Sequence, residues 1–195
     1  MNAVRIAVAA LLFTAWGVGH AHIQVFTGTL SPEATGATGS GTVTVEYEEE
    51  MHSLTVTTSF AGLSGVTTVA HIHCCVTTAG SGTAIVAVKA PTLDGFPAGV
   101  QSGDYSGTFD LSLASNFNQA FINGNGGSVG AAEAALVAAM VTGRAYLNIH
   151  TSPNFLGGEI RAFLTPAVPI PEPGTYALVI AGLGLLGCAA RARRR

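Results

Sequence analysis

The sequence predicts an all-β domain: an antiparallel Greek-key sandwich or barrel of about eight strands, with a short helical insertion at about residues 114–143. Three observations support this. Most of the chain consists of short segments in which apolar and polar residues alternate, as in half-buried strands. Turns rich in glycine, serine and proline separate these segments, and the chain contains 25 glycines. Alanine-rich sequence without alternation is confined to one interruption. Such a pattern is typical of sandwiches and barrels.

The strand predictions rest on a period of two residues. In GTVTVEYEEE (41–50), Val43, Val45 and Tyr47 share one face, and the segment 53–60 alternates in the same way. The short connection EEEMHS between them predicts a hairpin. The other predicted strands are 23–30, 67–73, 83–90, 104–111, 144–150 and 158–164.

The helical insertion has two parts, residues 114–124 and residues 128–143. Both lack runs of β-branched residues, and Gly143 is a suitable helix end. The residues expected to form the packing face of the second helix are Ala134, Leu136, Val137, Met140 and Val141.

The composition is that of one folded domain, about residues 22–166, once the two apolar ends of the chain are set aside. This domain contains ten acidic and three basic side chains, a formal charge of −7, whereas the whole chain carries −3. It has no basic patch, so nucleic acid is not expected as a partner. No nucleotide-binding or nucleophile-elbow motif is present either.

The N-terminal segment, residues 1–21, has the features of a secretory signal peptide. One cation, Arg5, precedes an apolar stretch that ends in small residues at Gly19 and Ala21. We expect cleavage after Ala21 and export of the rest of the chain, because the apolar run is short for a membrane anchor.

The C-terminal segment, residues 167–195, begins with Pro171, Glu172 and Pro173. An apolar stretch of 15 residues (176–190) and an arginine-rich end follow. A plain tail anchor is one interpretation, but the order of the three parts resembles the PEP-CTERM sorting signal. That resemblance implies recognition by an exosortase after passage through the secretion machinery. It also implies membrane attachment through this segment before processing, and then a place on the cell surface or in the extracellular matrix.

The stretch VAHIHCC (69–75) is the strongest candidate site. His71 and His73 share one face of a strand, and the same alternation places His150 on the polar face of the strand 144–150. Three histidines from two strands are a recurring way of binding copper or zinc. The alternative is that these histidines lie at polar strand ends and bond to backbone or water.

Cys74 and Cys75 allow several interpretations. As thiolates they are soft metal ligands, and as a bonded pair they would mark a tight turn after the strand. The bonded pair is slightly favoured because the domain is exported. The third cysteine, Cys188, lies in the sorting segment.

Two charged residues of the last strand and one further histidine complete the candidates. Glu159 and Arg161 share a face, and we expect them to form an ion pair that fixes the strand end. Glu159 is also the nearest carboxylate in sequence that could complete or orient a metal site. His22 would become the N-terminal residue after cleavage and could then bind copper.

The chain from about residue 23 to residue 164 resembles the CHRD domain, the module named after chordin. The motifs that carry the resemblance are the run 70–73 (AHIH) and the closing runs 148–151 (NIHT) and 157–161 (GGEIR). The family implies an extracellular β-domain. Cys74 and Cys75 depart from it, since a small turn usually follows AHIH. The histidine pattern is also similar to the copper ligands of copper–zinc superoxide dismutases, which share this architecture. The dismutase bridging histidine and zinc loop have no equivalent here, and fold similarity does not transfer activity.

These observations favour an exported, non-enzymatic CHRD domain protein that is directed to the cell surface or the exopolysaccharide matrix, with exopolysaccharide as a partner. The alternative is a copper- or zinc-binding extracytoplasmic protein that uses His71, His73 and His150. Redox activity would require a metal that is open to substrate.

Overall fold

A computed structural model describes residues 23–167, 182, 183 and 191 of the chain. Residues 23–166 form an antiparallel β-domain, which confirms the predicted class. All eight predicted strands are present, although the predicted strand 83–90 is reduced to three residues and a short strand follows the eighth. The strands are β1 (Ile23–Pro32), β2 (Ser40–Glu48), β3 (Ser53–Ala61), β4 (Val66–Cys74), β5 (Val86–Val88), β6 (Gly103–Asp110), β7 (Ala145–Ser152), β8 (Phe155–Phe163) and β9 (Thr165–Pro166).

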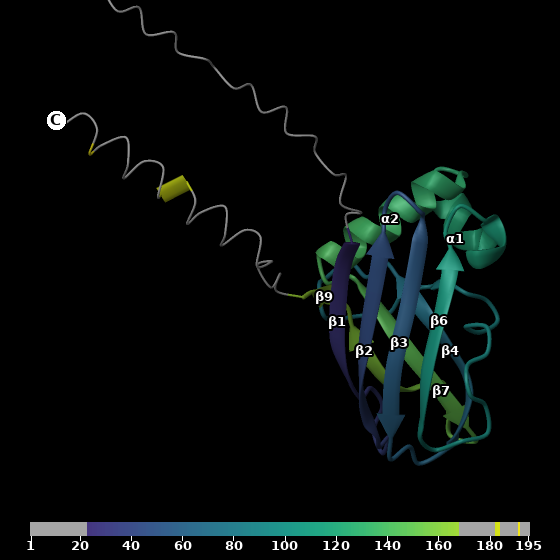
Figure 1. The fold of residues 1–195 in the computed structure, drawn as a ribbon. Coiled ribbons are helices and arrows are strands. Elements are labelled where there is room, and N and C mark those ends of the chain that lie inside the picture. Colours follow the sequence, from purple (N-terminus) through teal and green to yellow (C-terminus); the bar gives the residue numbers. More distant parts are fainter. Residues whose placement is uncertain (1–22, 168–181, 184–190, 192–195) are drawn as a thin grey trace, which may run out of the picture.

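The strands form one curled sheet in the order β5-β4-β7-β8-β1-β2-β3-β6, with β9 beside β1. β1 links the two halves of the sheet, since it pairs with β2 along most of its length and with β8 at Ser31 and Pro32. Figure 1 shows β4 and β7 behind the layer made by β1, β2, β3 and β6. The chain crosses from one half to the other after β3 and returns before β6, so β3 pairs with β6. The core lies between the two layers.

The predicted hairpin joins β2 to β3. Alternation along both strands directs Val45, Val56 and Tyr47 into the core, as expected from the pattern. His52 ends the turn with a φ of 50°, in the left-handed region that non-glycine residues seldom adopt.

The helical insertion consists of a 3-10 turn (Ala114–Asn116), α1 (Gln119–Gly124) and α2 (Val129–Val141). Figure 1 shows both α-helices at one end of the two layers. Gly143, with a φ of 67°, follows the end of α2 as predicted. The side chain of Ser128 caps its first turn by accepting a hydrogen bond from the Ala131 N–H.

The predicted packing face of α2 is partly wrong. Leu136 and Met140 are buried, whereas Ala134 and Val141 are exposed. α2 is apolar on nearly all sides, so its sequence does not define one face. Its orientation instead buries Glu133, whose carboxylate accepts hydrogen bonds from the Tyr47 hydroxyl at 2.8 Å and from His52 Nδ1 at 2.9 Å.

The predicted signal peptide (1–21), His22 and the motif Pro171, Glu172 and Pro173 lie outside the described residues, as does most of the apolar stretch 176–190. In the part of the chain that the structure describes, no helix has the length and apolarity needed to cross a membrane.

Candidate metal centre

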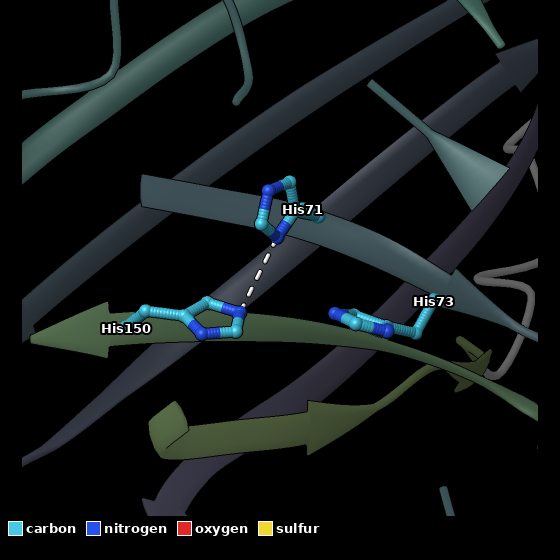
Figure 2. Close-up of side chains that lie close together, drawn as sticks. All are labelled: His71, His73 and His150. Carbon is cyan, nitrogen blue, oxygen red and sulfur yellow. Dashed lines mark hydrogen bonds between the residues drawn. The ribbon is translucent and has the colours of Figure 1, made fainter. Parts of the chain in front are cut away.

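The half of the sheet formed by β4, β7 and β8 has two unlike faces. Ala70 and Ile72 of β4 point into the core and are 0% exposed. His71 and His73 lie on the opposite face, and β7 places His150 there as well. Because β4 and β7 are antiparallel neighbours, the three rings meet on that face (Figure 2).

The three histidines are buried, and each bonds to the backbone, as in the alternative interpretation. Loops from the segments 75–92 and 153–156 cover them, so that His71, His73 and His150 are only 8%, 9% and 8% exposed. Each ring donates one N–H to a backbone carbonyl of a covering segment, a loop for His71 and His73 and the start of β8 for His150. His71 Nε2 donates to Pro91 O, His73 Nδ1 to Ala84 O at 2.9 Å, and His150 Nδ1 to Leu156 O at 2.8 Å.

These carbonyls decide which ring nitrogens carry hydrogen, since a carbonyl oxygen can only accept. In the neutral rings the lone pairs are therefore on His71 Nδ1, His73 Nε2 and His150 Nε2. One nitrogen atom from each ring lies within 4.8 Å of the others. The contact drawn in Figure 2 joins His71 Nδ1 to His150 Nε2 at 3.3 Å, so it brings two acceptors together. His73 Nε2 is buried without a partner.

Two of the rings, those of His71 and His73, are held in the neutral form by their surroundings. Burial lowers the pKa of His71 to about 4, although its bond to Pro91 O opposes the shift, and the nearby His150 and His73 add to it. Burial also lowers the pKa of His73, again against the effect of its backbone bond. Neutral imidazole is therefore the form of His71 and His73 expected at neutral pH.

Aromatic and cationic contacts hold the covering loop in place. The ring of Tyr146 stacks on His73, with 4.8 Å between centroids and 3° between planes. The Tyr146 hydroxyl accepts a hydrogen bond from the Ala84 N–H at 3.2 Å. Arg161 lies over Tyr146, 5.3 Å from its centroid, and donates to Gly82 O at 2.8 Å. The loop that supplies Ala84 O to His73 is therefore fastened at two neighbouring points.

The predicted ion pair between Glu159 and Arg161 is wrong. Arg161 Nε pairs instead with Glu33 Oε2 at 3.3 Å, just beyond the end of β1. The partners of Glu159 lie on other segments as well.

Glu159 is fully buried and accepts hydrogen bonds from five donors. They are the N–H and hydroxyl of Ser64, the N–H groups of Thr38 and Gly65, and the hydroxyl of Thr151. Burial acts to raise the pKa of Glu159, but hydrogen bonds from Ser64, Thr151 and Thr38 outweigh it and lower the pKa to about 2. All the hydrogen bonds of this carboxylate go to these groups, so it does not orient the histidines as expected from the sequence.

Glu33 and Asn148 lie beside the histidines and were not identified from the sequence. Asn148 is the partner of His71 in the strand register and shares a face of β7 with His150. Glu33 reaches the same place over Gly158, where a Cβ would overlap both the Glu33 carboxylate and the Asn148 amide. Alternation along β7 could have identified Asn148. Nothing in the local sequence identifies Glu33, which follows the end of β1.

Cys74 and Cys75 are bonded to each other in the structure. Cys74 belongs to the core face of β4, 1% exposed, opposite to His73. The structure therefore does not bring the cysteines to the histidines as thiolate ligands. Their placement at the end of β4 agrees with the interpretation of a bonded pair that marks a turn.

The three histidines suit copper or zinc. Neutral imidazole is a common ligand of both ions, and a ring whose second nitrogen donates to a carbonyl is fixed in orientation and made more basic. All three rings have such a carbonyl partner. The chemistry open to the centre is thus the binding of one borderline or soft cation.

The fold and this site define an antiparallel β-domain with a histidine cluster beneath its surface loops. Comparison with known families agrees with that class. The model of the CHRD domain matches residues 24–164, and the model of the PEP-CTERM protein-sorting motif matches residues 169–195. The chain belongs to the CHRD domain family. No curated protein and no solved structure matches it.

The two matches confirm the resemblances drawn from the sequence and describe an exported protein that is sorted by an exosortase. Neither family is an enzyme family.

Proposed function

We propose that the exported domain binds one copper or zinc ion through His71 Nδ1, His73 Nε2 and His150 Nε2. The observation that supports this most directly is the convergence of three buried lone pairs within 4.8 Å, with no proton among them in the neutral rings. Burying such acceptors without a donor is unfavourable, and one bound cation would accept the lone pairs of all three nitrogens. Histidines that served only to hold loops would need the three carbonyl bonds but would not need their other nitrogens to meet.

The metal content of the mature exported protein tests this proposal. Offered Cu²⁺, Cu⁺ and Zn²⁺ in turn and then freed of excess ion, it is expected to retain about one ion per chain by elemental analysis. The variant His71→Ala/His73→Ala is expected to retain none while keeping its circular dichroism spectrum. His52→Ala removes a histidine of the same domain outside the centre, so it should retain the ion. Absence of bound metal in the parent protein after all three ions would contradict the proposal.

For the mature protein we propose a binding role, without turnover, at the cell surface or in the exopolysaccharide matrix. The support is the sorting motif, which implies an exosortase as a partner, together with membership of two families that are not enzymes. A metal ligand set built into such a domain would let it hold metal outside the cell.

The sorting step has its own test. Replacement of Pro171, Glu172 and Pro173 by alanine in the full chain, in a host with an exosortase, is expected to leave the chain unprocessed and in the membrane fraction. Pro169→Ala, just before the motif, serves as the control. Equal processing of the triple variant and the parent, judged by mass and by fractionation, would show that the motif is not the recognised element.

A further inference from the structure

Three buried side-chain atoms in the described residues have no hydrogen-bond partner, and all three belong to one place. They are His73 Nε2, Asn148 Oδ1 and Glu33 Oε1. The Asn148 amide is oriented by its Nδ2 atom, which donates to Gly157 O at 3.4 Å, so its oxygen is the atom left without a partner. The other Glu33 oxygen is paired with Arg161.

All of these atoms are hydrogen-bond acceptors. With His71 Nδ1 and His150 Nε2 they form a set of five acceptors. The donor beside them is the Asn148 amide: burial raises the pKa of Glu33, and the hydrogen bond from this amide acts to lower it. The set divides into two kinds: three imidazole nitrogens that can bind a metal, and two side-chain oxygens. Glu33 is not a member of the ligand group that lies within 4.8 Å. Its carboxylate lies next to the Asn148 amide, over Gly158.

From this arrangement we infer that the metal keeps a fourth coordination position, which a water molecule fills, and that Glu33 Oε1 and Asn148 Oδ1 accept the two hydrogens of that water. The inference rests on the proposed function. Three histidines leave one position of a tetrahedral ion open, and a water there has two O–H donors for the two unpartnered oxygens.

Such a water is exchangeable, which distinguishes the centre from a closed structural site. Other small ligands can enter the same position. Glu33 would discriminate among them, because its negative charge beside the position opposes anions and favours neutral molecules that donate hydrogen. The ligand class expected at the centre is therefore small, neutral and protic.

Azide binding to the Co²⁺-loaded protein tests the inference, with the visible d–d absorption of cobalt as the readout. The parent is expected to show a saturable spectral change as azide replaces the water. Glu33→Gln is expected to bind azide about tenfold more tightly, since a charge next to the position is removed. Glu46→Gln makes the same change of net charge on the exposed face of β2 and should bind azide like the parent.

Asn148→Asp adds a charge at the second oxygen and is expected to weaken azide binding, so the two variants should shift affinity in opposite directions. If cobalt binds but azide changes nothing in the parent, or if Glu33→Gln behaves like Glu46→Gln, the water position is wrong while the metal centre stands. If the parent binds no cobalt, the titration is repeated on the Cu²⁺-loaded protein; if it retains none of cobalt, copper and zinc, both proposals fail.

Discussion

Glu159→Ala is expected to lower the free energy of unfolding by about 3–5 kcal/mol, a large part of the stability of a domain of this size. The carboxylate is 0% exposed, and five donors from three separate segments point at it. Removing it leaves the Gly65 N–H and the Thr151 hydroxyl buried without an acceptor, whereas Thr38 and Ser64 are exposed residues whose donors can turn to water. Urea denaturation of the metal-free protein at pH 7, followed by circular dichroism, measures the loss.

The same carboxylate makes the free energy of unfolding depend on pH in acid solution. Its pKa is about 2 in the folded protein, against a reference value of 4.5 for an unperturbed glutamate. Its contribution is therefore fully present above pH 4.5 and is lost as the pH falls towards 2. Glu159→Gln, which keeps the shape but does not titrate, should lose less stability than alanine. Its unfolding free energy should also depend less on pH between 4.5 and 2.

Glu46→Gln provides the control, since Glu46 is exposed and its removal should change stability by less than about 0.5 kcal/mol. An unfolding midpoint of Glu159→Ala equal to that of Glu46→Gln would show that the five donors are satisfied in another way. In that case the loops that carry Thr38 and Ser64 are not held by this residue.

The position of Glu159 shows where prediction from sequence ends. Alternation with a period of two predicted the strands and correctly placed His71 and His73 on one face, because side-chain direction in a strand is a local property. The partners of Glu159 are 94 to 121 residues away for Ser64, Gly65 and Thr38, and no local pattern connects them. The predicted pair with Arg161 used the nearest charge in sequence, whereas the fold offered closer donors.

The same limit applies to the metal centre. The sequence predicted which histidines share a face, but it did not predict that the face is covered. The histidines are buried by the segments that carry Ala84, Pro91 and Leu156. The backbone oxygens of these residues determine which nitrogen of each neutral ring carries hydrogen, and therefore where the three lone pairs lie. Glu33 belongs to the site through the pairing of β1 with β8, which is a long-range contact. The packing face of α2 was predicted only in part for a related reason: Glu133 is buried by its partners on the β2–β3 hairpin, which lie far away in the sequence.

His73→Phe is expected to weaken metal binding and to leave the stability of the metal-free protein nearly unchanged, whereas Glu159→Ala lowers that stability. His73→Phe should reduce metal affinity by more than about 100-fold, beyond the cost of losing an outer partner of a ligand, because one of three ligands is gone. The stability of the metal-free protein should stay within about 1 kcal/mol of the parent or rise. Phenylalanine keeps the stack on Tyr146 and gives up the bond to Ala84 O, worth about 1 kcal/mol, but it also removes a buried Nε2 that has no partner.

Thermal unfolding with and without metal separates these two effects. Metal at about 1,000 times the parent's dissociation constant should stabilise the parent by about 4 kcal/mol. It should stabilise His73→Phe by no more than about 1.4 kcal/mol, because a 100-fold loss of affinity leaves the metal at about ten times the variant's dissociation constant. A histidine that only fastened the loop would give a different result: its loss would weaken the metal-free protein and would not alter a response to metal. If His73→Phe unfolds as readily as Glu159→Ala, His73 is structural. If the metal-free variant is at least as stable as the parent but is stabilised far less by metal, the unpartnered nitrogen of His73 contributes to metal binding and not to the stability of the metal-free protein.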